Sequence, residues 1–365
     1  MSPATGFAAA IQDLGREARA GVGAPDLALL KRLKLGAGAA QGAGRLLLLF
    51  APGPGPWLLG TLCLGYYFAV EAQLNHSIMH GAYAGIPGAG RFTPSGYESL
   101  ALPFQSRTWG DAHRLHHASP SLLDLDPDAL HPLFRVHHSQ EWRPWHRFNA
   151  FLGGLFTFEL WAFDYDRFLK RTGHRPRDDR GELSKLALYA GWQYVFFAAL
   201  AGARWKQMLL ATLAASIVRN LIFTGLQTGS SVGRDVSTLH PLDASPKRMD
   251  AWYRFQAETS KNFALHGIWR VLCGGLDRHI EHHLYPNLPP NRLHALSPAI
   301  RELCRAQGVG YSEYPSFWAS LGDSLSYLEG LSAPPRSYPG GGGRYARLPV
   351  GPAAGDRRAR AAPES

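Results

Sequence analysis

Long apolar runs separated by short turn-forming segments restrict the fold of this chain more than any other feature. Residues 57–74 (WLLGTLCLGYYFAVEAQL) approach the roughly 20 mostly apolar residues that a helix needs to cross a bilayer. The preceding run, 36–50, is rich in glycine and carries Arg45, and the segment APGPGP that follows it is typical of a turn. The two runs together predict a helical hairpin in a membrane.

A second pair of apolar runs predicts a second hairpin. Residues 186–203 and 208–226 are separated only by RWKQ. Arg219 lies inside the last run, and a charged side chain at bilayer depth is costly unless it faces protein or water. The sequence alone does not say which of these Arg219 does.

Composition narrows the class of protein further. The chain has 365 residues and a formal net charge of +10, but its Arg and Lys residues are scattered and no zinc-finger, RRM or basic-helix pattern occurs. We therefore expect a membrane as partner and no nucleic acid. The three cysteines, Cys63, Cys273 and Cys304, are far apart, which argues against a disulfide scaffold or an iron–sulfur cluster. Electrons for any redox reaction would have to come from another protein.

Nine of the 16 histidines form a spaced pattern. Spacings of three and four residues place side chains on one face of a helix, so each cluster should present its imidazoles in one direction. HSIMH is an H-x-x-x-H pair, HRLHH and HIEHH are H-x-x-H-H triplets, and NFALH places a ninth histidine four residues after an asparagine. The histidines are His76, His80, His113, His116, His117, His266, His279, His282 and His283.

Imidazole nitrogens are suited to iron, zinc, copper and nickel. Nine histidines exceed the ligand number of one metal ion, and a zinc site uses only four ligands. The pattern therefore predicts two metal ions, each with several nitrogen ligands and a position left open. Carboxylates are expected beside the ligands, where they would orient the rings. The candidates near the clusters are Asp111, Asp277 and Glu281.

The clusters can meet only if they lie on one side of the membrane. Each hairpin returns the chain to its starting side, once before His76 and again before His266 and His279. The short run 150–163, which contains Glu159, should then lie at the interface and not cross. The distribution of Lys and Arg places the clusters on the cytoplasmic side.

These elements predict an all-α integral membrane protein with two transmembrane hairpins, about four spans, and a cytoplasmic helical cap carrying the histidine clusters. We expect three regions. Residues 1–35 form a lead-in whose segment 26–36 is suited to a membrane surface, residues 36–332 form the membrane domain, and residues 333–365 form a flexible basic tail rich in Pro and Gly.

The order and context of the histidine clusters resemble those of the membrane fatty-acid desaturase family over roughly residues 40–312. TWGDAHRLHH resembles the second histidine box, and DLDPDALHPLF resembles the Asp-Pro-Asp segment that follows it. FQAETSKN and GGLDRHIEHHLYPNLPPNRL resemble the approach to the third box in acyl-lipid and linoleoyl-CoA, or front-end, desaturases. Two features depart from the front-end pattern: His279 stands where Gln is common, and a fused cytochrome b5 domain is absent from the sequence.

The resemblance implies an O₂-dependent desaturation at two non-haem iron ions, fed by an external donor of the ferredoxin or cytochrome b5 type. The substrate would be a long acyl chain on a lipid or on CoA, and the location a bacterial inner membrane. Asn262, acting through water, and His266 would complete the metal shell. We expect Trp109 and Gln256 beside the substrate, and an apolar tunnel lined by Trp109, Tyr66, Tyr67 and Phe68.

Two alternatives remain open from the sequence. A hydroxylase or ketolase acting on a fatty chain, sphingoid base or carotenoid shares the same histidine boxes. A non-catalytic membrane protein that binds metal would not need the clusters to converge. The other histidines are interpreted as surface or interfacial residues: His131, His137, His138, His146, His174, His240 and His294.

Overall fold

The computed structural model describes residues 6–122, 125–128, 135–137, 140–149, 155, 157–162, 179–236 and 249–334. Within these ranges the protein is mainly helical, as predicted, with one short parallel pair of strands that was not predicted. The longer elements are α1 (Phe7–Ala20), α2 (Ala24–Phe50), α3 (Pro54–Met79), α4 (Ser106–Ala118), α6 (Asp179–Ala190), α8 (Trp205–Ser231), α9 (Met249–Glu258), α12 (Pro290–Ala306) and α13 (Phe317–Ser332). The shorter ones are η1 (Pro144–Phe148), η2 (Gly191–Phe196), α7 (Phe197–Leu200), η3 (Gly202–Arg204), β1 (Lys261–Phe263), α10 (Ile268–Leu272), η4 (Leu276–Arg278), α11 (His279–Leu284) and β2 (Ser312–Tyr314).

Helices α2 and α3 form the first predicted helical pair. The chain turns between them at residues 51–53, where Gly53 has a φ of 107°, and α3 begins at Pro54. The two helices approach closely because small residues face each other: a Cβ on Gly44 would lie 2.8 Å from the Gly60 carbonyl oxygen. Helix α2 begins at Ala24, so the expected boundary at residue 35 lies inside a continuous helix.

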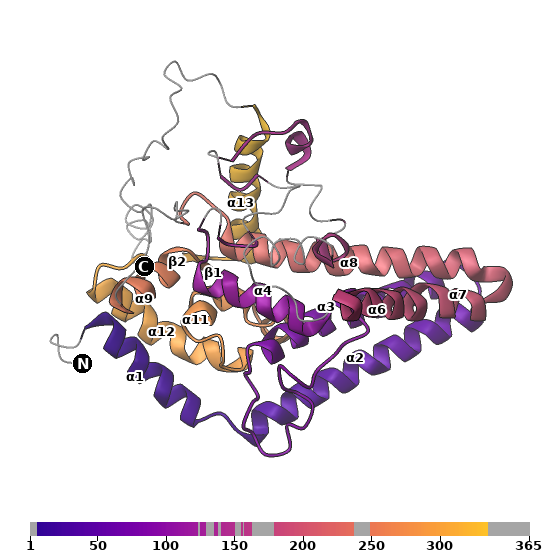
Figure 1. Cartoon of the computed structure of the whole chain (residues 1–365), viewed down its shortest axis with the longest axis horizontal. Coiled ribbons are helices and arrows are strands. Elements are labelled where there is room, and N and C mark those ends of the chain that lie inside the picture. Colours follow the sequence, from indigo (N-terminus) through magenta and orange to yellow (C-terminus); the bar gives the residue numbers. More distant parts are fainter. Residues whose placement is uncertain are drawn as a thin grey trace, which may run out of the picture.

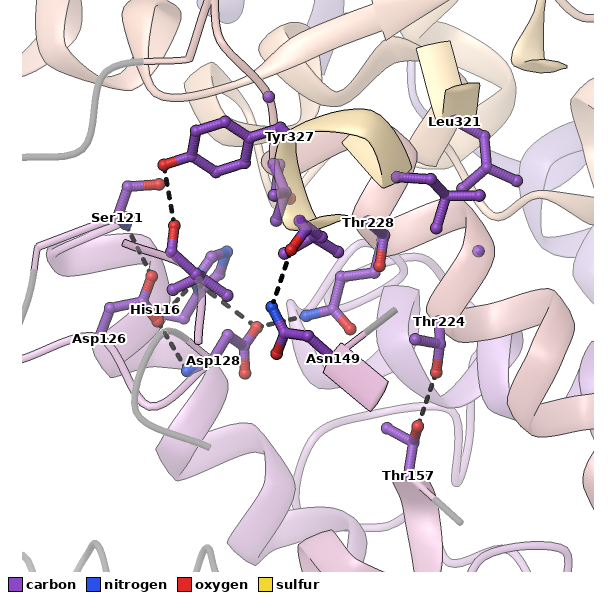
Figure 2. A pocket seen from close by; sticks show the side chains of 18 of the residues that line it. His116, Ser121, Asp126, Asp128, Asn149, Thr157, Thr224, Thr228, Leu321 and Tyr327 are labelled. Carbon is purple, nitrogen blue, oxygen red and sulfur yellow. Dashed lines mark hydrogen bonds and ion pairs between the residues drawn. The ribbon is translucent and has the colours of Figure 1, made fainter. Parts of the chain in front are cut away.

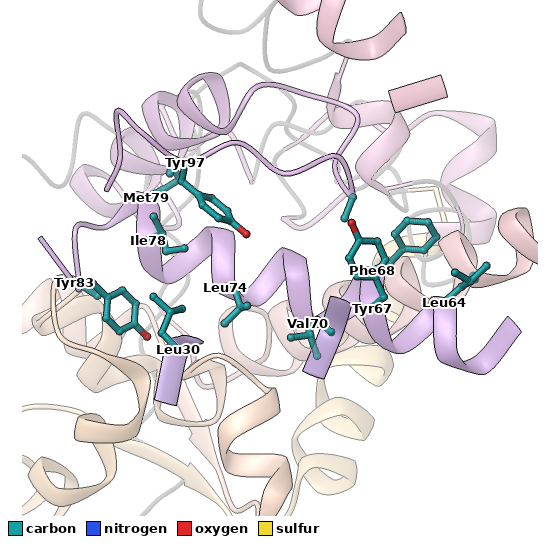
Figure 3. Close-up of a cluster of buried hydrophobic side chains, with 14 of the residues drawn as sticks. Leu30, Leu64, Tyr67, Phe68, Val70, Leu74, Ile78, Met79, Tyr83 and Tyr97 are labelled. Atoms are coloured by element: carbon teal, nitrogen blue, oxygen red, sulfur yellow. The ribbon is translucent and has the colours of Figure 1, made fainter. Parts of the chain in front are cut away.

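The side of α3 that faces α2 and α8 carries the largest cluster of buried apolar side chains. Leu64, Phe68 and Ile78 are fully buried there, together with Leu30 of α2 (Figure 3). Burial of such side chains stabilises the fold by about 1.5–3 kcal/mol each. Tyr67 and Phe68 therefore belong to the core between the long helices, and Tyr66 is partly exposed.

The second predicted pair contains an irregular first helix. Helix α6 continues into a π-helical turn, η2, then α7 and η3, before α8 begins at Trp205. A π-helical turn is rare and usually marks a local requirement. Here it contains Gln193, which is buried and accepts a hydrogen bond from Arg45 at 2.7 Å. The π-helical turn thus places Gln193 where it accepts a hydrogen bond from Arg45, a cation buried in α2.

Arg219 of α8 faces protein, which answers the question that the sequence left open. Its guanidinium is fully buried, donates to the Ala101 carbonyl oxygen at 3.0 Å and forms an ion pair with Glu159. Glu159 lies in the helical residues 157–162 and also accepts from Asn220. Arg219 therefore links α8 to the segment that contains Ala101 and to the helical residues 157–162.

One helical stretch of the described residues, Gly202–Ser231, is long and apolar enough to cross a membrane. Helices α2, α3 and α8 extend along the long axis of the molecule, with α6 and α7 beside α8, and α1, α9, α11 and α12 gather at one end (Figure 1). The number of spans, the interfacial position of 150–163 and the membrane side remain predictions. Most of the expected C-terminal tail, from residue 335, lies outside the described residues.

The end of the molecule opposite the α2–α3 turn contains α1, α9, α11, α12 and the strands (Figure 1). Strands β1 and β2 pair in parallel, with Asn262 opposite Glu313. Gly274 and Gly275, both with positive φ, turn the chain just before η4 and α11. A Cβ on Gly274 would collide with the Gln73 side chain, so glycine at this position lets α11 approach α3.

Candidate metal centre

Three helices bring the predicted histidines together. His76 lies near the C-terminal end of α3, and His80 caps it. Helix α4 carries the HRLHH triplet, and α11 is built almost entirely from HIEHH. Because the spacings are three and four residues, each helix directs its imidazoles to one side, as the sequence predicted.

Five of the histidines form a first group. Each offers a ring nitrogen that lies within 4.8 Å of the others, and four of the five are buried. The Nε2 atoms of His76 and His113 are 2.8 Å apart, and those of His117 and His113 are 3.1 Å apart. The members are His76, His80, His113, His117 and His282.

A second, smaller group lies beside the first. It consists of His116, His279 and His283, all buried, with ring nitrogens within 4.8 Å of one another. The rings of His117 and His283 stack with their centroids 4.3 Å apart, so the two groups are directly adjacent. His279, the residue that departs from the front-end pattern, is one of the three members of this group.

Buried nitrogens without hydrogen-bond partners show that these residues fit metal ions. Nε2 of His80, His282 and His283 is buried and has no partner. Buried polar atoms are nearly always satisfied, so each exception needs an explanation. A metal ion on these nitrogens would provide one, and the all-imidazole donor set suits a transition metal.

In two rings of the second group, hydrogen bonds on Nδ1 set the tautomer. Nδ1 of His283 donates to Oε1 of Gln256 at 2.9 Å, and Nδ1 of His279 lies 3.2 Å from the Ser230 carbonyl oxygen. In each ring Nε2 is then left as the nitrogen for a metal, an arrangement common around metal sites. Burial and the neighbouring histidines hold the pKa of His283 well below its usual value, so the ring stays neutral, the form that binds metal.

Asp126 and Asp128 were not among the predicted site residues. Oδ1 of Asp126 accepts from Nδ1 of His116 at 2.9 Å, and Oδ2 of Asp128 lies 3.6 Å from the same nitrogen. Although burial acts in the opposite direction, these carboxylates raise the pKa of His116 to about 9, so a metal ion binding its Nε2 would displace the proton held there. The signal was present in the sequence as the Asp-Pro-Asp segment after the second box.

Gln256 has a different role from the predicted one. Its Nε2 donates to the His117 carbonyl oxygen at 2.8 Å while its Oε1 holds His283, so it links two helices of the centre. These contacts give Gln256 a positioning role, and its contact with substrate stays a prediction. Trp109 is buried with its ring centroid 5.8 Å from that of His76, among Phe104, Phe158 and Phe223. It packs behind the first group.

The three predicted orienting carboxylates do not contact the histidines of either group. Asp111 forms an ion pair with Arg114 on the outer side of α4. Asp277 contacts Cys273 and His294, and Glu281 accepts from Tyr311 at 2.7 Å. Asp277 in η4 and Glu281 in α11 therefore bond to residues of the surrounding cap, and Asp111 bonds within α4.

His266 and Asn262 of the predicted ligand set lie outside the two groups, and their roles as ligands stay predictions. His266 is exposed in the segment after β1, outside both groups. Asn262 is buried, but its amide donates to Glu281 and Tyr311 and its Oδ1 accepts from the Ile280 backbone N–H. The β1–β2 pairing fixes Asn262 against the back of α11, so its role is to hold that helix. His146 is buried and His294 is bonded to Asp277, so neither is a free surface residue.

Replacing Asp126 by asparagine is expected to lower metal affinity of the second group about 10–100-fold, the usual cost of losing an orienting carboxylate. The shape of the side chain is kept, and only its charge is lost. Titration with iron followed by elemental analysis measures the effect. Asp111→Asn is the matched control and should bind metal like the parent; equal losses in both variants would contradict the assignment.

Comparison with known proteins gives the family. The sequence model described as fatty acid desaturase matches residues 52–315. This chain is a member of the fatty acid desaturase family. An NADPH-dependent stearoyl-CoA 9-desaturase from Mycobacterium tuberculosis is 29% identical over 348 residues, covering 90% of this chain and 80% of the relative. An sn-1 linoleoyl-lipid 6-desaturase from Synechocystis is 29% identical over 303 residues, covering 78% and 83%. An acyl-lipid (7-3)-desaturase from Rebecca salina is 26% identical over 314 residues, covering 78% and 66%.

A cavity of about 260 Å³ lies beside the second histidine group of this desaturase (Figure 2). Its inner end includes His116 and Ser231, whose Oγ lies 3.3 Å from Nδ1 of His279. Its walls include Trp161, Leu221, Leu321 and Leu328. The predicted tunnel residues Tyr66, Tyr67, Phe68 and Trp109 do not line it: Tyr67, Phe68 and Trp109 pack in the helical core, and Tyr66 is partly exposed elsewhere.

Proposed function

We propose that this enzyme introduces a double bond into a long acyl chain, using O₂ and two electrons from an external donor. The observation that carries the proposal is the pair of adjacent buried histidine groups at the end of a largely apolar cavity, in a member of the fatty acid desaturase family. The reaction converts two neighbouring methylenes, O₂, two electrons and two protons into an alkene and two waters.

The histidine groups are proposed to hold two iron ions, which would supply O₂ activation when bound. His76, His80, His113, His117 and His282 would hold one ion, and His116, His279 and His283 the other. Asp126, Asp128 and Gln256 position the rings. The second group has fewer imidazoles and borders the cavity, so it leaves more room on the side where substrate would lie.

The apolar walls of the cavity would position the chain and exclude water. A volume of about 260 Å³ is slightly below the usual range of about 300–1,000 Å³ for ligand sites, which suits part of a long chain and not a whole lipid. Holding one carbon–carbon bond beside the centre supplies the orientation that attack on an unactivated methylene requires.

We further propose that the centre lies on the cytoplasmic face of a bacterial inner membrane, where a ferredoxin or cytochrome b5 type donor can reach it. The apolar helix Gly202–Ser231 supports membrane insertion. A hydroxylase or ketolase remains the alternative on the same scaffold, and the names of the relatives favour desaturation of acyl chains over it.

Expression in a bacterium of defined lipid composition, together with a ferredoxin and its reductase, tests the reaction type. Mass spectrometry of fatty-acid methyl esters should show a new double bond that requires O₂. A hydroxyl or keto product would establish the alternative instead. An unchanged lipid profile from iron-loaded protein with a working donor would contradict both.

A further inference from the structure

The 3₁₀ helix η1 exposes an unusual surface. Trp145 is 43% exposed and Phe148 60% exposed, and both are flanked by arginines, Arg143 and Arg147. The Arg147 guanidinium lies 5.8 Å from the ring centroid of Trp142. Aromatic rings alternating with arginine, on a surface and not in a core, have the composition of a membrane–water interface. We call Arg143, Trp145, Arg147 and Phe148 the η1 surface.

The η1 surface is attached to the end of the apolar helix through α13. Helix α13 is fixed to the last turn of α8 by serines: Ser320 donates to the Gly229 carbonyl oxygen at 2.6 Å, and Ser324 to the Val232 carbonyl oxygen at 2.6 Å. In Figure 1, α13 stands across this end of α8. If α8 crosses the bilayer, α13 lies where the helix leaves it.

Hydrogen bonds then hold η1 against α13. The indole of Trp142 donates to the Ser332 carbonyl oxygen at 2.9 Å, and Asn149 donates to the Leu328 carbonyl oxygen at 3.4 Å. The η1 surface is therefore held at the level of the last turn of α8 and α13, not on the cap formed by α9, α11 and α12.

The cavity also reaches these same elements. Asn149, which follows η1, and Leu325 and Leu328 of α13 line it. Two of its lining residues are exposed, Leu325 at 37% and Leu221 of α8 at 50%, whereas His116 is buried. The cavity thus borders both the second histidine group and leucines at the surface.

We propose that η1 and α13 lie in the interface of a bilayer containing anionic phospholipid, and that the acyl chain of a membrane lipid enters the cavity sideways past Leu325. The second half of this proposal rests on the proposed desaturation. A chain that enters here moves from one apolar phase to another without crossing water. Arg147 matches the phosphates of lipid headgroups, whereas Arg143 is paired with Glu141 at 2.5 Å. The acyl carrier is then a membrane glycerolipid and not a soluble thioester.

Photocrosslinking of the full-length protein tests the surface directly. p-Benzoylphenylalanine is placed at Phe148, at Leu325 or, as control, at Ala299, which is exposed on α12. Each variant is reconstituted with phosphatidylethanolamine and phosphatidylglycerol and illuminated, and adducts are identified by mass spectrometry. Phospholipid adducts are expected at Phe148 and Leu325 at severalfold the level at Ala299.

The outcomes separate the two halves of the proposal from each other and from the reaction. Background adduct levels at Phe148, and at Trp145 as a second site, would overturn the interface. Phospholipid at Phe148 with labelled oleoyl-CoA captured preferentially at Leu325 would overturn entry from the lipid. Crosslinking needs no turnover, so a failure to form double bonds would not change it. Iron content equal to that of the parent shows that each variant is folded.

Discussion

Replacing His282 by alanine is expected to abolish desaturation and to lower bound iron from two ions per chain to about one or fewer. His282 comes from α11, whereas the other four members of its group come from α3 and α4. Its loss removes the only ligand in that group contributed by the third box. Elemental analysis of purified protein and methyl-ester analysis of lipids measure the two effects.

His266→Ala is the control, because the sequence pattern and the structure predict different results for this variant. His266 belongs to the NFALH motif and was predicted as a ligand, yet it is exposed and outside both groups. We expect this variant to keep the iron content and activity of the parent. Loss of iron equal to that of His282→Ala would show that the segment after β1 folds onto the centre.

Replacing Arg219 by alanine is expected to destabilise the protein by about 3–5 kcal/mol, the cost of removing one partner from a buried ion pair. Arg219 is fully buried and bridges Ala101 and Glu159 to α8. Without it, the Glu159 carboxylate loses its cationic partner and keeps only the neutral donors Asn220 and Tyr189, and the Ala101 carbonyl group loses a donor. Thermal unfolding in detergent, followed by circular dichroism, measures the loss.

The double variant Arg219→Met, Glu159→Gln separates the charge from the packing. It removes both charges while keeping side chains of similar length, so it should be more stable than Arg219→Ala. If Arg219→Ala unfolds at the temperature of the parent, the ion pair contributes nothing to stability. Iron content should change little in the double variant, because Arg219 does not contact the histidine groups.

Short-range periodicity was sufficient to predict the histidine groups. Spacing within HSIMH, HRLHH and HIEHH places the rings on one face of a helix, and this needs no knowledge of the rest of the fold. Eight of the nine predicted histidines lie in the two groups for this reason. The ninth, His266, depended on a helical reading of NFALH, but the motif begins in strand β1, paired with residues about 50 positions later, and His266 lies in the segment after it.

The residues that orient the rings could not be predicted from proximity in sequence. Asp111, Asp277 and Glu281 are adjacent to the clusters, but a neighbour along a helix usually points elsewhere. Asp126 lies ten residues from His116, and Gln256 lies 27 residues from His283. Their positions depend on how α9 and the turn after α4 pack, which periodicity does not encode. The same holds for the cavity, whose walls come from α8, α13 and the residues around η1.

The attachment of α1 to the far end of the chain has a consequence for synthesis on the ribosome. The Tyr285 hydroxyl donates to the Ile11 carbonyl oxygen at 2.7 Å, and Phe7 and Ile11 share a buried cluster with Leu293 and Ile300. The first helix to emerge therefore cannot bury its apolar side until α11 and α12 have been translated. Contacts between such distant residues form slowly. Helix α11, which carries the last histidine cluster, and α1 should then pack together in one late step. Nascent chains that end before about residue 300 are expected to bind no metal and to leave α1 open to proteases.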